Sequence, residues 1–152
     1  MAFLNNPIAL IITASLIIQI IVLLLLFYGY WLKKKMKFRQ HGIVMTLATV
    51  LHLTMILYIM IPSFVEGIIP DYIVPSPLAI IPVVGLIHGI LGTTALSLGV
   101  WLIASWRFRK NLKGCFNKKK FMFITLNVWL ASIVFGIILH AILIDLYWRV
   151  KA

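Results

Sequence analysis

Four histidines lie in or at the edge of long apolar stretches of this sequence, and their type and placement point to metal or haem chemistry. Neutral imidazole is a common protein ligand for iron, copper and zinc. An ionisable side chain inside a membrane-spanning segment is costly, which favours a functional explanation for it. The four residues are His41, His52, His88 and His140.

The first two histidines share one apolar segment, residues 41–61, which is long enough at about 20 residues to cross a bilayer. His41 and His52 are separated by about three helical turns, so both project from one stripe of a helix. Met55 continues the same stripe and would add a soft thioether ligand.

The elements that must position these side chains are four apolar runs. The chain has 152 residues, of which 63% are hydrophobic, whereas a soluble domain is about half apolar. We expect one all-α transmembrane domain, residues 1–152, that forms an integral membrane four-helix bundle. Its predicted spans are 7–32, 41–61, 83–106 and 121–147. Residues 62–82 contain five prolines, which predict an irregular outer loop rather than a regular helix.

The charge distribution predicts how the bundle lies in the bilayer. The net charge is +11, and most Lys and Arg residues fall in two segments, 33–39 and 107–120. Such clusters mark cytoplasmic loops, so we expect a multi-pass protein of the cell (plasma) membrane with both termini outside. Nucleic-acid binding is not expected, because no soluble surface remains to carry it. The single cysteine, Cys115, excludes a disulfide within the chain.

This topology places three histidines at compatible depths. His52, His88 and His140 would lie in the outer half of the bundle, whereas His41 would lie at the inner interface. Haem b is the first cofactor that they indicate, because it needs two axial ligands on facing helices: His88 with His140, or His52 with His88. Copper is the alternative, with two or three histidines and Met55. His41 and Met55 are weaker candidates, and each histidine alone can be explained by a hydrogen bond to a neighbouring helix.

Other polar and small residues bear on the same interior. Gln19, in the first span, predicts an interhelical hydrogen bond rather than a cofactor contact. The glycines of the third span predict close helix packing, with the alternative that they leave room beside His88 for a flat macrocycle. Ser132 shares a helix face with His140 but lies about two turns away, so no nucleophile–base pair is expected. The glycines are Gly85, Gly89, Gly92 and Gly99.

Several short motifs resemble the DUF420 membrane family, whose CtaM-like members are linked to maturation of haem-copper oxidases. They are LKKKMKFRQ before His41, LIHG around His88, and WLASIVFG near the C-terminus. The resemblance covers roughly residues 30–143 and implies family histidines at His41 and His88, with Trp129, Leu130 and Gly136 matching the last span. At Pro62 and Ser63 the chain departs from the expected histidine, which His52 and His140 would replace. The overall shape is also similar to small transmembrane b-type cytochromes.

The leading functional hypothesis is a membrane redox accessory protein of a respiratory, haem-copper oxidase-like system, with one haem b or copper centre for electron transfer. Its partners would be the lipid bilayer and a larger respiratory complex, with a quinone as a further candidate. An oxidase assembly factor that passes on haem or copper is the second hypothesis. A structural subunit without a cofactor is the third. The chain is not expected to be an enzyme by itself.

Overall fold

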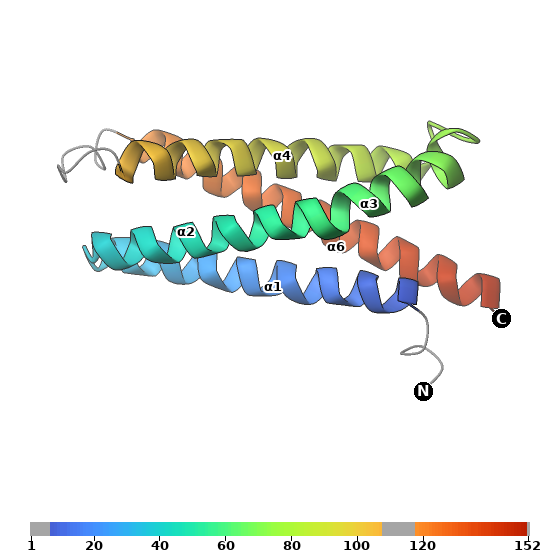
Figure 1. Cartoon of the computed structure of the whole chain (residues 1–152), viewed down its shortest axis with the longest axis horizontal. Helices are drawn as coiled ribbons and strands as arrows, with labels where there is room; N and C mark the ends of the chain where they lie inside the picture. Colours follow the sequence, from blue (N-terminus) through green and yellow to red (C-terminus); the bar gives the residue numbers. More distant parts are fainter. Residues whose placement is uncertain (1–6, 108–117, 152) are drawn as a thin grey trace.

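The computed structural model describes residues 7–107 and 118–151, and the regular structure of these residues is entirely helical. Four of the helical stretches are long and apolar enough to cross a membrane, as predicted. They lie side by side as an antiparallel bundle, in which α1 begins at the same end at which α6 finishes (Figure 1). The elements are α1 (Pro7–Lys34), α2 (Phe38–Met55), η1 (Ile56–Met60), α3 (Ile61–Ser63), η2 (Phe64–Ile73), α4 (Ile80–Arg107) and α6 (Lys119–Lys151).

A three-residue turn joins α1 to α2 and folds them into the first helical hairpin. Met36 adopts a left-handed conformation, with φ of 60°. The Lys37 N–H donates to the Leu32 carbonyl at 3.0 Å, and the Met36 N–H donates to the Lys33 carbonyl at 3.1 Å. These two bonds form a Schellman motif, which satisfies the last carbonyls of α1. Lys33 and Lys34 in the last turn of α1 also complement its dipole.

The second long helix continues through Pro62 and Pro70, the first two of the prolines that predicted a loop. It extends to Ile73 rather than ending near 61, because the backbone widens into π-helical turns at η1 and η2. Pro70 lies inside η2, which ends with the Val74 N–H donating to the Ile69 carbonyl at 3.0 Å. Proline in an α-helix clashes with the carbonyl of residue i−4, and we infer that the wider turn relieves this clash.

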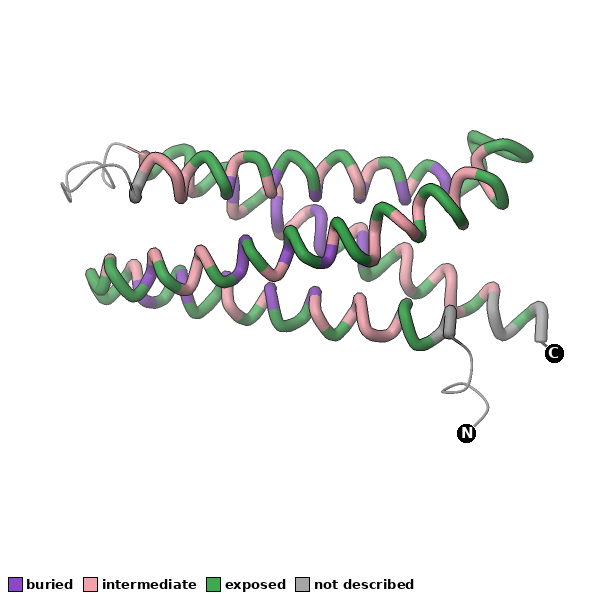
Figure 2. The backbone as a smooth tube through the Cα atoms, viewed as in Figure 1, coloured by how far each residue is buried: buried purple, intermediate pink, exposed green. Residues whose placement is uncertain are grey.

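The bundle consists of two closely packed hairpins, α1 with α2 and α4 with α6, and its core lies where they meet. Buried positions follow the inner sides of the helices, while the outer faces are exposed (Figure 2). The main cluster combines side chains of α1, α2, α4 and α6, namely Val22, Leu26, Ala48, Ala95, Trp129 and Ile133.

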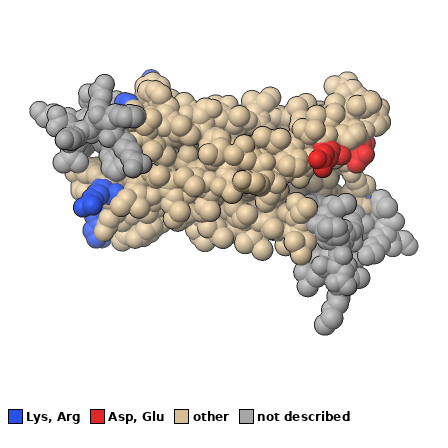
Figure 3. Space-filling view, in the orientation of Figure 1, with Lys and Arg blue, Asp and Glu red and all other residues tan. Residues whose placement is uncertain are grey.

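Charged side chains separate to the two ends of the bundle. Glu66 and Asp71 lie at the end formed by η2, whereas lysines gather at the opposite end (Figure 3). Asp145, the third acidic residue of the chain, forms an ion pair with Arg149 at 2.8 Å near the end of α6. The long surface between these ends is almost entirely uncharged, as a hydrocarbon environment requires.

Candidate functional site

Five buried polar side chains from all four long helices form what we call the polar core. Each is at most 8% exposed, so each has left water almost completely. Burial of a polar group costs free energy unless a hydrogen bond compensates it, so every member needs a partner. The polar core comprises Gln19 of α1, Thr49 and His52 of α2, His88 of α4, and Ser132 of α6.

His88 is anchored to α6 by its Nδ1 atom, which lies 2.8 Å from the Ser132 carbonyl oxygen. A carbonyl can only accept, so Nδ1 carries the proton in this hydrogen bond. In a neutral imidazole, Nε2 then holds the lone pair. The Ser132 hydroxyl donates back to the His88 carbonyl at 3.4 Å, so the two residues join α4 and α6 twice. Histidines that ligate metals are commonly oriented by a carbonyl on the other nitrogen in this way.

His52 reaches across the hairpin interface from α2 to α4. Its Nε2 donates to the Gly92 carbonyl at 3.4 Å, a longer bond than the one made by His88. The Trp129 ring meets the His52 ring edge-on, with centroids 5.1 Å apart. His52 and His88 both lie near the Ser132 hydroxyl, whose oxygen is 3.5 Å from Nδ1 of His88 and, like Nε2 of His52, lies within 4 Å of a Cβ placed on Gly92. The structure therefore brings together two of the three predicted outer histidines, with Nδ1 of His52 and Nε2 of His88 as the nitrogens not engaged by carbonyls.

Two glycines make room for these side chains, and substituting either would disturb the polar core. A Cβ on Gly136 would lie 2.8 Å from Cε1 of His88 and would also collide with Oε1 of Gln19. A Cβ on Gly92 would lie 3.2 Å from the Ser132 hydroxyl and 3.8 Å from Nε2 of His52. Side chains of the polar core therefore occupy the space that these two glycines leave open.

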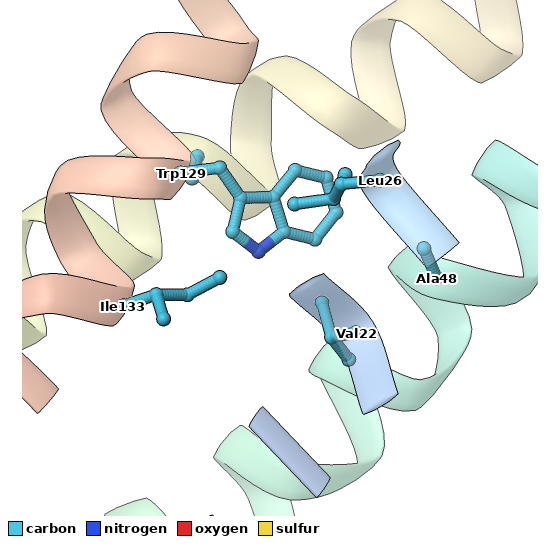
Figure 4. Close-up of a cluster of buried hydrophobic side chains, with 6 residues drawn as sticks. Val22, Leu26, Ala48, Trp129 and Ile133 are labelled. Carbon is cyan, nitrogen blue, oxygen red and sulfur yellow. The ribbon is translucent and has the colours of Figure 1, made fainter. Parts of the chain in front are cut away.

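Two buried polar atoms near this level lack hydrogen-bond partners among the described residues. They are Oε1 of Gln19 and Nε1 of Trp129. The Trp129 indole projects from α6 toward Val22 and Leu26 of α1, and Ile133 flanks it (Figure 4). Gln19 and His88 both pack against Gly136, but the interhelical hydrogen bond predicted for Gln19 is not made by its Oε1.

His41 belongs to a separate contact nearer the basic end of the bundle. Its Nδ1 donates to the Gly29 carbonyl of α1 at 2.7 Å. A Cβ on Gly29 would lie 2.9 Å from Sδ of Met45, so His41 and Met45 both pack into the notch that this glycine leaves. His41 was the weakest candidate ligand, and the structure gives it a defined role in joining α1 to α2.

The remaining candidates are placed around the polar core rather than in it. His140 is half-buried and lies one turn beyond Gly136 on α6, while Met55 is buried one turn beyond His52 on α2. Within residues 7–107 and 118–151, no three His, Cys, Asp or Glu side chains are grouped closely enough to hold a metal ion. A three-histidine copper site made of His52, His88 and His140 is therefore not formed in this structure.

The glycine face of α4 differs from the predicted one at a single position. Gly85 contacts the Ile68 side chain, and Gly99 contacts Thr49 and Trp129, but nothing lies within 4 Å of a Cβ placed on Gly89. The prediction that Gly89 packs against another helix is therefore wrong for the bundle itself. At about 100° per residue, Gly89 is rotated about 60° from Gly92, which turns it away from the interface.

Sequence reasoning did not identify the partners of the histidines. Backbone carbonyls of Gly29, Gly92 and Ser132 accept these hydrogen bonds, and a carbonyl has no signature in a sequence. The pairing of small residues with histidines was the available signal, because glycine or serine opposite a ring permits it to reach the facing backbone.

Comparison of the chain with known family models, curated proteins and solved structures finds no match.

Proposed function

We propose that this chain is a membrane redox accessory protein of a respiratory system that binds one copper ion through His52 and His88. The observation that supports it most directly is the hydrogen bond from Nδ1 of His88 to the Ser132 carbonyl. This bond fixes the tautomer in which Nε2 is the electron-pair donor, and burial keeps water from competing for it. The respiratory context follows from the resemblance of the short motifs around His41, His88 and Trp129.

Copper suits the interior better than haem b does. A macrocycle needs a flat space beside its axial histidine, whereas Gly136, Gln19 and Ser132 lie close to the His88 ring. A single ion does not require that the two hairpins separate by the thickness of a ring. Met55, buried on the same helix as His52, would add a soft ligand of the kind that Cu(I) prefers. We therefore favour copper over haem b, the first cofactor that the sequence indicated.

The residues of the polar core have distinct roles in this proposal. His88 and His52 would bind the ion, the Ser132 and Gly92 carbonyls orient their rings, and Trp129 fixes the plane of His52. When bound, copper supplies one-electron transfer between its two common oxidation states. An ion that is retained serves electron transfer, whereas an ion that is passed on serves oxidase assembly.

The test is an anaerobic Cu(I) titration of the purified protein in competition with a chromophoric chelator. We expect one ion per wild-type chain, and at least about tenfold weaker binding in His88→Ala and His52→Ala. His41→Ala is the matched control, because it also removes a histidine bonded to a facing carbonyl but lies outside the polar core. Circular dichroism would show that each variant retains its helices.

Equal copper affinity in all four proteins would overturn the proposal. A Soret band in the protein purified from its native membrane would identify haem instead, and would show that the two hairpins open to admit it.

A structural subunit is the second candidate, and one observation favours it. His41, His52 and His88 each hydrogen-bond a carbonyl on a different helix from their own, which is sufficient to explain why a bundle would contain them. In that case each His→Ala variant loses a hydrogen bond worth about 0.5–1.5 kcal/mol, with no metal bound by the wild type.

A further inference from the structure

Asn127 is exposed on the outer face of α6, within the apolar stretch of that helix. It lies about 12 Å along the helix axis from Lys119, at 1.5 Å per residue. Lys118 lies over the Trp101 ring at 4.3 Å, and Trp101 packs edge-on against Phe121, so basic and aromatic side chains mark the interface level at the start of α6. Asn127 therefore faces hydrocarbon once the bundle is in a bilayer.

The hydrogen bonding of Asn127 is incomplete at this position. Its Nδ2 donates to the Phe123 carbonyl of the same helix at 2.8 Å. A carboxamide has a second N–H and an acceptor oxygen, and the described residues supply neither of these with a partner. Lipid tails cannot supply one either, so the amide has an unmet donor and an unmet acceptor where both are costly.

Asn127 differs in this respect from the exposed hydroxyl side chains of α4. Thr94 and Ser97 on the outer face of α4 each donate their only O–H to a carbonyl of their own helix, at 2.7 and 2.9 Å. Their donors are thereby satisfied. From Phe121 to Ala141, Asn127 is the only exposed residue of α6 whose side chain can form a hydrogen bond.

We propose that α6 docks against α6 of a second copy of this chain, with the two Asn127 amides paired across a two-fold axis. The free N–H of each amide donates to the oxygen of the other, so the pair satisfies both the unmet donor and the unmet acceptor of each Asn127. An isologous interface brings identical residues together, and a carboxamide is complementary to itself. Ala131, one turn further along the same face, is small enough to let the two helices approach.

The experiment measures the monomer–dimer equilibrium of the full chain in detergent micelles by sedimentation equilibrium, and in liposomes by energy transfer between labelled chains. We expect wild type to dimerise and Asn127→Leu to raise the dissociation constant at least about tenfold. Asn127→Gln keeps the amide and should retain a dimer. Ser97→Ala, on the outer face of α4, is the matched control and should not change the equilibrium.

A wild-type chain that stays monomeric at high protein-to-lipid ratio would overturn the proposal. So would a dimer of unchanged affinity in Asn127→Leu, which would place the interface on another face. Dimerisation only in the presence of a different protein would show that the amide pairs with a hetero-partner, and would equally refute the second copy.

Discussion

Gln19 shows how a single buried polar atom can affect the stability of this bundle. Its Oε1 is buried without a hydrogen-bond partner among the described residues, although it packs against Gly136. An unsatisfied buried acceptor costs about 1–3 kcal/mol, which is a large fraction of the stability of a small protein. Gln19 can persist despite this cost for two reasons. Either a bound ligand normally donates a hydrogen bond to Oε1, or no substitution has replaced the residue.

Replacing Gln19 by leucine tests this cost directly. Leucine has a similar volume and no polar atom, so we expect Gln19→Leu to raise the free energy of unfolding by about 1–3 kcal/mol. Chemical denaturation of the metal-free protein in mixed micelles would measure it. Gln19→Glu is the control, since it keeps the shape but buries a carboxyl group. A lower stability in Gln19→Leu would show that the amide has a partner worth more than its burial cost.

At the scale of elements, α4 makes its close contacts with other elements through a row of glycines. One face of it carries Gly85, Gly92 and Gly99, each of which meets side chains of another element within 4 Å. Seven-residue spacing is close to two full turns, so these three stay on one side while Gly89 drifts off it. Helix association in a membrane depends on such close contacts, because lipid tails provide no hydrophobic driving force between helices.

This geometry predicts opposite outcomes for two glycine substitutions on the same helix. Gly99→Leu forces a branched side chain toward Thr49 and Trp129, 3.4 Å from each at its Cβ, and should cost about 1–3 kcal/mol. Gly89→Leu enters open space and should leave the stability of the monomer nearly unchanged. Thermal unfolding in detergent would compare the two. Equal destabilisation would show that Gly89 also packs, in an assembly larger than one chain.

At the scale of the whole molecule, the ends of the bundle differ in charge while its middle is apolar. Lysines and arginines gather where α1 meets α2 and where α6 begins, and Glu66 and Asp71 lie at the opposite end (Figure 3). Basic segments stay on the cytoplasmic side during insertion, so we propose that this end faces the cytoplasm. The polar core then lies between the two surfaces, shielded from both by apolar packing.

A labelling experiment tests the proposed orientation. Cys115, the only cysteine, lies outside the described residues, in the segment between α4 and α6. We expect a membrane-impermeant thiol reagent to modify it only after cells are permeabilised. The matched variant carries Cys115→Ser with Ser76→Cys, because Ser76 is exposed in the turn before α4 at the acidic end. If the reagent modifies Cys115 in intact cells and modifies Ser76→Cys only after permeabilisation, the topology is the opposite of the one proposed.

The number of long helices could be predicted from the sequence because it depends on local properties. Apolar runs long enough to cross a bilayer, separated by basic segments, suffice to predict four helices, and each is present. The prolines after residue 61 misled this prediction, because proline is incompatible with an α-helix but not with the wider turns of η1 and η2. Local composition could not show that the backbone would change there from α-helical to π-helical hydrogen bonds.

The arrangement of the candidate site, by contrast, depended on how the helices rotate and pack against one another. The sequence predicted that His52 and His88 lie at compatible depths, but only the fold shows His88 bonded to the Ser132 carbonyl and His52 to that of Gly92. Depth follows from position along a helix, whereas contact follows from rotation about its axis. That rotation depends on contacts between side chains distant in sequence, such as Trp129 of α6 packed against Val22 and Leu26 of α1 (Figure 4).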